Sequence, residues 1–334
     1  MDTNGIMGAR PLGLAAGAAA LAFALATASP AAAAPSSASV ANDALTVSSG
    51  SGADRIALRL AAGAPGTLEV DFGDDGSADF SFDRATFSRI DVSAGSGDDQ
   101  VRIDEVNGTF EDEATTIYGG SGSDTIDGGQ GAELLIGGSG SDVIDGNRGN
   151  DTAHLGSGND SFRWDPGDGS DTIGGHSGTD TLDFNGADAV ENMRLSPNGE
   201  RSLFFRDAGN INMDMDDVEQ LDLTTLGGVD TFTAEDMSGT DFVRADVDLS
   251  GSAGGGDGAS DVVTVNATAD DDQLEVSTDG TAVEVEGLQT TVGIVGSETI
   301  DKLQVNTLQG DDAVDVDDAV SALIEVFVDL GDQP

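Results

Sequence analysis

The chain contains no cysteine, so disulfides cannot stabilise it. It has only 13 lysines and arginines against 63 aspartates and glutamates, which gives a formal net charge of −50. So few basic residues leave no basic patch for phosphate groups, which argues against nucleic acid and anionic membrane surfaces as partners. A compact chain with this charge repels itself. We therefore expect divalent cations as its counterions and bound metal as the substitute for disulfides.

Recognisable catalytic motifs are also missing. The chain has two histidines, His154 and His176, and no HExxH, GxSxG or phosphate-binding loop followed by lysine. We expect both histidines to be solvated surface residues, and the chain not to be an enzyme. Carboxylates are so frequent that their number does not exclude a catalytic pair of aspartates of the glycosidase type. A polysaccharide-active β-helix is therefore an alternative, with Lys302 as the only lysine to assist.

Glycine, in contrast, is abundant, and much of it lies in a nine-residue repeat between Gly119 and Phe184. Seven units follow one another, with two extra residues, Trp164 and Asp165, after the fifth unit. The fourth position is glycine in every unit. The sixth is always acidic: Asp124, Glu133, Asp142, Asp151, Asp160, Asp171 and Asp180. The eighth is always apolar: Ile126, Leu135, Ile144, Ala153, Phe162, Ile173 and Leu182.

This pattern predicts a turn followed by a very short strand in each unit. Glycine tolerates the positive φ angles of tight turns, and the last three residues alternate as strand residues do. Two units then make one coil. Stacked coils place the eighth positions in a narrow core and the sixth-position carboxylates along two rims. Because strands lie ~4.8 Å apart, seven units give a stack on the order of 17 Å long.

Carboxylates stacked at this spacing repel each other unless a cation lies between them or water separates them. Carboxylate and carbonyl oxygens are hard ligands, which suit Ca²⁺ better than zinc or copper. A Gly/Asp/Ser-rich flexible linker is the other reading. It does not account for the apolar eighth position, so the pattern favours a calcium-binding β-roll.

The nonapeptide G-G-x-G-x-D-x-U-x is the Ca²⁺-binding β-helix repeat, and the block resembles the RTX, or haemolysin-type calcium-binding, family. The resemblance implies Ca²⁺ between turns two units apart, held by sixth-position carboxylates and turn carbonyls. Asp124, Asp142 and Asp160 would then line one rim, with Glu133, Asp151 and Asp171 on the other and Asp180 continuing the series. The carbonyls would lie near Gly120, Gly122, Gly138, Gly140, Gly156 and Gly158. We expect the ladder to be interrupted at Trp164-Asp165.

The rest of the chain repeats this pattern less regularly. We predict an all-β, right-handed parallel β-roll or β-helix solenoid, with degenerate coils over 35–118, the RTX-type β-roll over 119–184 and a solenoid-like continuation over 185–334. Weaker copies of the unit begin near Ser49, Ala94, Thr225 and Thr307. The DFGDDGSADF stretch around Asp74 lacks the spacing of an EF-hand, and we interpret it as a turn with solvated acids rather than a calcium loop.

Residues 1–34 have the features of a secretory signal: Arg10, an apolar run from Leu12 to Ala28, and Ala32-Ala33-Ala34 as a cleavage site. A transmembrane anchor is less favoured because the run is short and rich in alanine. We therefore expect a secreted, extracellular Ca²⁺-binding protein that folds when it meets calcium. The alternative is a structural or adhesive surface protein that calcium stiffens, with an extracellular or cell-surface partner.

Overall fold

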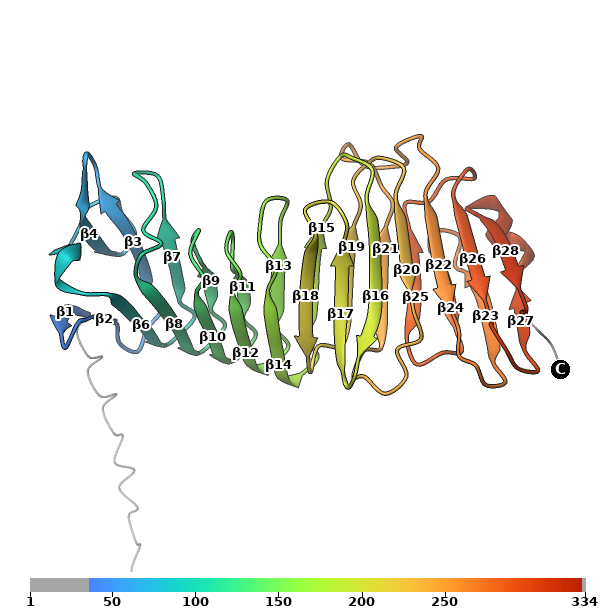
Figure 1. Ribbon diagram of the computed structural model, residues 1–334, viewed down its shortest axis with the longest axis horizontal. Helices are drawn as coiled ribbons and strands as arrows, with labels where there is room; N and C mark the ends of the chain where they lie inside the picture. The colour runs from blue at the N-terminus through green and yellow to red at the C-terminus, as the bar shows by residue number, and fades with distance from the viewer. Residues whose placement is uncertain (1–35, 332–334) are drawn as a thin grey trace, which may run out of the picture. The chain divides into compact units, whose positions relative to one another are not determined.

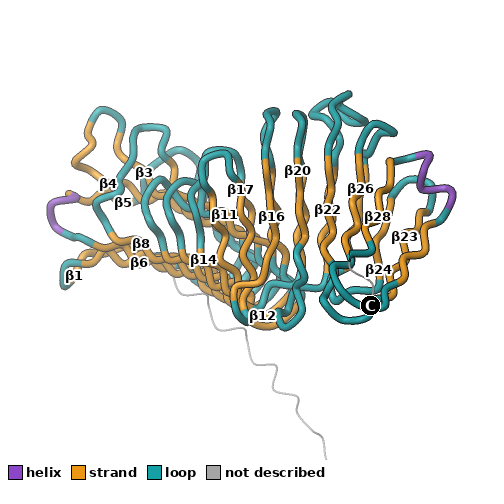
Figure 2. The backbone as a smooth tube through the Cα atoms, turned by 45° about the vertical axis from the view of Figure 1, so that its right-hand side comes forward, coloured by secondary structure: helices purple, strands orange, loops and turns teal. Residues whose placement is uncertain are grey.

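Short strands alternate between two facing sheets whose inward side chains form one hydrophobic core. The computed structural model describes residues 36–331, and these form two 14-stranded sheets, A and B (Figure 1). The turns that join the sheets gather along two edges (Figure 2). We call the turns that lead from sheet A to sheet B rim 1, and those that lead back from sheet B to sheet A rim 2.

Sheet A contains, in order across the sheet, β1 (Ser37–Ala41), β2 (Ala44–Ser48), β6 (Arg89–Ser96), β8 (Ala114–Ser121), β10 (Leu134–Ser139), β12 (Thr152–Gly158), β14 (Thr172–Gly178), β18 (Ile211–Asp216), β17 (Arg201–Arg206), β16 (Asn192–Asn198), β20 (Thr231–Ala234), β22 (Val262–Asn266), β26 (Lys302–Asn306) and β28 (Glu325–Asp329).

Sheet B contains, in order, β27 (Ala313–Val316), β23 (Gln273–Thr278), β24 (Val283–Glu286), β25 (Thr291–Val295), β21 (Arg244–Asp248), β19 (Gln220–Thr224), β15 (Thr181–Asn185), β13 (Ser161–Trp164), β11 (Val143–Asp145), β9 (Thr125–Asp127), β7 (Gln100–Asp104), β3 (Arg55–Ala61), β4 (Ala64–Phe72) and β5 (Phe80–Asp83). The described residues also contain two short 3₁₀ helices, η1 (Arg84–Thr86) and η2 (Asp318–Ala322).

The nonapeptide block forms the predicted parallel β-roll. Each strand pairs in parallel with the strands two units before and after it, so Ile144 lies between Ile126 and Phe162 in sheet B. All seven eighth-position side chains are at most 1% exposed. Alternation with a period of two therefore fills the core, as expected for strands with one buried face. The prediction of an all-β parallel roll is confirmed.

Antiparallel segments interrupt the parallel stacking, which the repeat pattern did not predict. β16, β17 and β18 form a meander that runs backwards along sheet A, so that β18 pairs with β14 and β16 pairs with β20 (Figure 1). β3–β4–β5 and β23–β24–β25 are antiparallel as well. Tight turns with positive φ, such as that at Gly199 between β16 and β17, allow these reversals.

Trp164 is a core residue and not part of a surface insertion. It ends β13, is fully buried, and stacks on Phe184 with ring centroids 4.1 Å apart. Its indole Nε1 donates to the carbonyl of Gly169 at 2.8 Å. The two extra residues are absorbed in the loop at 165–168, where Asp165 and Asp168 hydrogen-bond to each other.

The predicted signal segment, 1–34, lies outside the described residues. Within residues 36–331, neither helix is long and apolar enough to cross a membrane.

Glycine stacking in the turns gives a direct test of this fold. Gly140 has φ +128°, and a methyl group on it would lie 2.0 Å from the carbonyl oxygen of Gly122 in the preceding coil. Gly140→Ala therefore adds overpacking to backbone strain, and we expect it to cost roughly 2–5 kcal/mol of stability. Gly199→Ala is the matched control: its φ is +74° and no atom lies within 4 Å, so strain alone should cost about 1–2 kcal/mol. Equal losses in denaturant unfolding would contradict the stacked turns.

Candidate metal centre

The sixth-position carboxylates of rim 1 form a hydrogen-bonded ladder between coils. The backbone N–H of Asp124 donates to Oδ1 of Asp142 at 2.8 Å, and that of Asp142 donates to Oδ1 of Asp160 at 2.7 Å. The N–H of Asp160 donates to Oδ1 of Asp180 at 2.9 Å. Each carboxylate therefore bridges to the coil before it, and the predicted rim residues lie in register.

Rim 2 has the same arrangement. The N–H of Glu133 donates to Oδ1 of Asp151 at 2.7 Å, and that of Asp151 donates to Oδ1 of Asp171 at 2.8 Å. The ladder thus continues past Trp164-Asp165, and the predicted interruption there is wrong. The loop at 165–168 takes up the two residues, and the hydrogen bond from Asp151 to Asp171 is nearly as short as the one before it. The ladder on this rim ends at Asp171. Thr172 pairs with Asp214 of β18, so the residue opposite Asp171 is Met213, which has no carboxylate.

One oxygen of each ladder aspartate is buried without any hydrogen-bond partner. Burying an unpaired charged oxygen is strongly unfavourable, and its repetition along the ladder points to a series of cation-binding positions. In residues 36–331 the buried, unpartnered carboxylate oxygens are Oδ2 of Asp99, Asp124, Asp142, Asp151, Asp160, Asp171, Asp180 and Asp230.

Backbone carbonyls converge on these free oxygens beside the first-position glycines. A methyl group built on Gly137 would lie 2.5 Å from Oδ2 of Asp142 and 2.4 Å from the carbonyl oxygen of Leu155 in the next coil. At Gly119 the corresponding distances are 2.5 Å to Oδ2 of Asp124 and 2.8 Å to the carbonyl oxygen of Gly137. Carboxylate and carbonyl oxygens from successive coils therefore face one another, which is an all-oxygen set of the kind that Ca²⁺ prefers.

The turn glycines also direct carbonyls along the stack. Methyl groups on Gly138 and Gly156 would lie 2.2 and 2.1 Å from the carbonyl oxygens of Gly120 and Gly138 in the preceding coils. A methyl group added to Gly158 would likewise lie 1.6 Å from the carbonyl oxygen of Gly140. In residues 36–331, no three His, Cys, Asp or Glu side chains form a metal cluster. A cation here needs these carbonyls in addition to carboxylates.

Glu133 differs from the aspartates at the same position. Its longer side chain reaches back into its own turn, where Oε2 accepts the N–H of Gly129 at 2.9 Å and the backbone of Gly131 supplies another hydrogen bond. Glu133 therefore has no unpartnered buried oxygen. Its place on rim 2 is as predicted, but its carboxylate is already satisfied by the protein.

Burial makes the ladder acids hard to ionise. It raises the pKa of Asp151 to about 9, and the charges of Glu133 and Asp171 add to this effect against the hydrogen bond from Glu133. Burial also raises the pKa of Asp171 and of Asp180 to about 7, and that of Asp142 to about 6. The folded chain thus favours bound protons or another cation at these positions.

Comparison with known families agrees with this geometry. The family model for the RTX calcium-binding nonapeptide repeat, in four copies, matches residues 116–132 and 127–162. Residues 116–162 are RTX calcium-binding nonapeptide repeats. No curated protein matches the chain. In the structure the same ladder extends beyond the matched RTX residues on both sides.

Asp99 is a rung of the RTX ladder that the sequence analysis did not include among the candidate ligands. Its N–H donates to Oδ1 of Asp124 at 2.8 Å, and its own Oδ1 accepts the N–H of Asp54 at 2.7 Å. Burial raises its pKa to about 6. The signal was present in the Ala94-Gly95-Ser96-Gly97-Asp98-Asp99 unit, but a 25-residue spacing to Asp124 hid its register.

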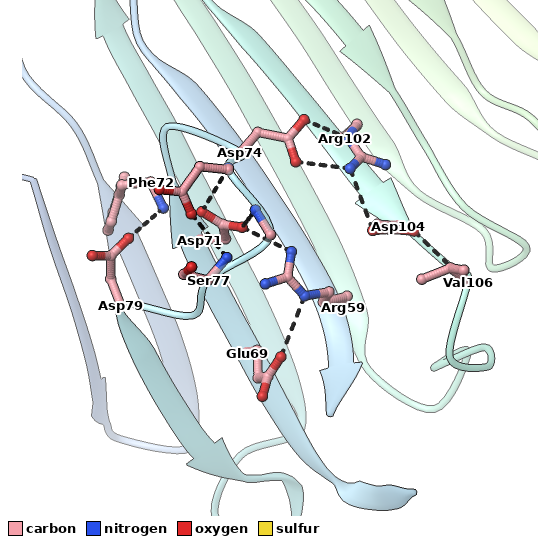
Figure 3. Close-up of polar contacts among 12 residues, drawn as sticks. Arg59, Glu69, Asp71, Phe72, Asp74, Ser77, Asp79, Arg102, Asp104 and Val106 are labelled. Atoms are coloured by element: carbon pink, nitrogen blue, oxygen red, sulfur yellow. Dashed lines mark hydrogen bonds and ion pairs between the residues drawn. The ribbon is translucent and has the colours of Figure 1, made fainter. Parts of the chain in front are cut away.

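The DFGDDGSADF stretch is a turn held by arginines (Figure 3). Asp71 is fully buried and pairs with Arg59 at 2.8 Å, so it is not solvated as predicted. Both oxygens of Asp74 accept hydrogen bonds from Arg102, at 2.7 and 2.8 Å, which lower the pKa of Asp74. Guanidinium groups supply here the positive charge that the RTX ladder lacks.

The two histidines are exposed, as predicted, but they contact each other. Nε2 of His176 lies 3.2 Å from Nδ1 of His154 across the β12–β14 pair. The 22-residue separation combines one 18-residue coil with the two extra residues and a two-position shift along the strand, so the nine-residue period did not predict the contact.

The raised pKa values predict how pH affects the metal-free chain. Because Asp151, Asp171 and Asp180 have folded-state pKa values above the ordinary 3.8, the stabilisation from their protonation is fully present below about pH 4 and is lost as pH rises through about 7 to 9. In EGTA, the thermal midpoint should therefore rise when pH falls from 9 to 6. Asp151→Asn, which cannot titrate, should flatten this slope. A midpoint that falls over the same interval would contradict the assignment.

Proposed function

We propose that the chain is a secreted calcium-binding protein in which Ca²⁺ bound between stacked RTX turns stabilises the β-roll, and that it has no catalytic activity. The observation that carries the proposal is the series of buried Oδ2 atoms without partners along both rims. Seven of these eight atoms belong to one continuous stack of coils between Asp99 and Asp180. A cation beside each of them would remove a penalty that the protein leaves uncompensated.

The candidate ligands follow from the positions in the turns. On rim 1 these are the carboxylates of Asp124, Asp142, Asp160 and Asp180, together with Asp99. On rim 2 they are Asp151 and Asp171, while Glu133 would contribute less because its own turn satisfies it. Turn carbonyls complete the proposed set: those of Gly120, Gly122, Gly138, Gly140, Gly156 and Gly158.

Calcium would supply positive charge where the chain's own residues provide almost none. Between Gly119 and Phe184 the only arginines are Arg148 and Arg163, and there is no lysine. Without cations, the rim carboxylates repel one another and oppose stacking of the coils. A ligand at 100 times its Kd adds ~2.7 kcal/mol per site, so several sites together would decide whether the block is folded.

Secretion is supported by the signal-like sequence of residues 1–34. Extracellular calcium modules typically bind Ca²⁺ at ~10⁻⁴–10⁻³ M. Sites of this affinity would stay empty inside a cell and fill outside it, which would couple folding to export. The proposal of binding without catalysis is supported by the exposed, mutually hydrogen-bonded histidines and by the missing catalytic motifs.

Asp142→Asn tests the role of one free oxygen without breaking the ladder. Asparagine keeps an Oδ1 that can accept the N–H of Asp124, but it loses the charge carried by Oδ2. The metal-free variant should be at least as stable as the parent, because a buried charge is removed. Its gain in stability on adding Ca²⁺ at 100 times the Kd should be smaller by about 2.7 kcal/mol, the contribution of one site. Thermal unfolding in EGTA and in excess Ca²⁺, followed by far-UV circular dichroism, measures both quantities.

Glu200→Gln is the matched control for the charge change, since Glu200 is exposed in the β16–β17 hairpin. It should leave the calcium-induced stabilisation unchanged. The proposal is wrong if the parent chain melts at the same temperature in EGTA and in excess Ca²⁺.

A further inference from the structure

The two histidines of the chain come together on the outward face of sheet A, on the neighbouring strands β12 and β14. His154 lies opposite Gly174 in the register of these strands, and His176 lies opposite Gly156. Nε2 of His176 is 3.2 Å from Nδ1 of His154, and the ring centroids are 5.3 Å apart. Both side chains are exposed. Two imidazole nitrogens, the commonest metal ligands among protein side chains, therefore meet at the surface of the β-roll.

Gly174 keeps the space between the two rings open. A methyl group on Gly174 would lie 3.3 Å from Nδ1 of His154 and 3.6 Å from Nε2 of His176. These are the same two nitrogens that contact each other. On the other side of Gly174, Asp216 of β18 is the next residue in the row, and its carboxylate pairs with Arg201 at 2.9 Å. The donors that face the space over Gly174 are therefore nitrogens.

His176 occupies a backbone conformation that the preceding coils give to glycine. Its φ is +72°, in the left-handed region that glycine adopts most readily. The residues at the same place in the four preceding coils of sheet A are Gly95, Gly120, Gly138 and Gly156, all with positive φ. Strain of this kind gathers at binding and catalytic sites. The strained residue here is the one that brings the second imidazole to the first.

The separation of the two nitrogens fits two ligands of one metal ion. A tetrahedral Zn²⁺ with Zn–N bonds of about 2.0–2.1 Å holds two imidazole nitrogens about 3.3–3.4 Å apart. In the metal-free contact, one neutral ring donates its N–H and the other accepts it. A metal ion would take the place of this hydrogen, which would move to the outer nitrogen of the same ring. Imidazole suits zinc, copper and nickel, whereas Ca²⁺ prefers oxygen, so this contact and the carboxylate ladder select different ions.

We propose that His154 and His176 together bind one divalent transition-metal ion of the imidazole-binding class, such as Zn²⁺ or Cu²⁺, through Nδ1 and Nε2 respectively. Within residues 36–331 no third His, Cys, Asp or Glu side chain joins them, so water completes the coordination. The ion links β12 to β14 on the outside of the RTX block. It lies apart from the calcium positions proposed for the rims and does not depend on them.

Isothermal titration of the full chain with Zn²⁺ tests this site, in excess Ca²⁺ so that the carboxylates are already occupied. His154→Gln and His176→Gly should each bind Zn²⁺ at least tenfold more weakly than the parent. His176→Gly also restores the glycine of the other coils, so its thermal midpoint without Zn²⁺ should equal or exceed that of the parent, and its loss of binding would not reflect unfolding. Glu200→Gln should bind Zn²⁺ as the parent does. Equal Zn²⁺ affinity in the parent and both histidine variants would overturn the proposal.

Electron paramagnetic resonance of bound Cu²⁺ shows whether one ion is shared by both rings. The parent spectrum should contain coupling to two nitrogen nuclei, and that of each single variant should not. Because the rings share one ion, the double variant should lose little more Zn²⁺ affinity than either single variant. A parent spectrum with oxygen ligands only, or losses that simply add in the double variant, would contradict a shared site.

Discussion

Stacking turns of the same sequence in a β-roll places carboxylates of like charge next to one another. Each ladder aspartate gives one oxygen to the backbone of the neighbouring coil, and this hydrogen bond fixes the register. The second oxygen is buried on the same rim as those of its neighbours, without a donor. The parallel pairing, the glycines in the turns and the narrow core all follow from the same stacking, so the fold depends on how this buried charge is neutralised.

Positive charge is distributed unevenly over the chain. Near the N-terminus, Arg59 and Arg102 pair with Asp71 and Asp74, and beyond the meander Arg206 pairs with Glu191. The coils between them have almost no basic side chains, and their free oxygens point toward carbonyls instead. A guanidinium occupies a fixed place and is always charged, whereas a bound cation depends on its concentration outside the chain. Under the proposed function, the arginine-paired segments carry their own counter-charge, and the repeat block would gain part of its stability from calcium in its surroundings.

The period of nine was enough to predict which residues enter the core and which line the rims. Ile126, Ile144 and Asp142 lie where the pattern places them, because each position in a stacked unit has a single environment. The pattern could not show that the carboxylate of Glu133 accepts hydrogen bonds from its own turn. That depends on the extra methylene of glutamate and on the turn N–H groups within its reach. Asp99 was missed as a rung because a long connection separates it from its neighbour in the stack by 25 residues. The break expected at Trp164 was wrong because loops between coils absorb insertions without moving the rungs.

The position of bound calcium tests the central claim most directly. A crystal structure of the chain grown in saturating Ca²⁺, with anomalous scattering used to locate the ions, would show where they lie. We predict ions within about 2.3–2.6 Å of the Oδ2 atoms of Asp142 and Asp160, each between successive turns and in contact with turn carbonyls. Ordered coils with no ion beside these oxygens at saturating Ca²⁺ would contradict the account.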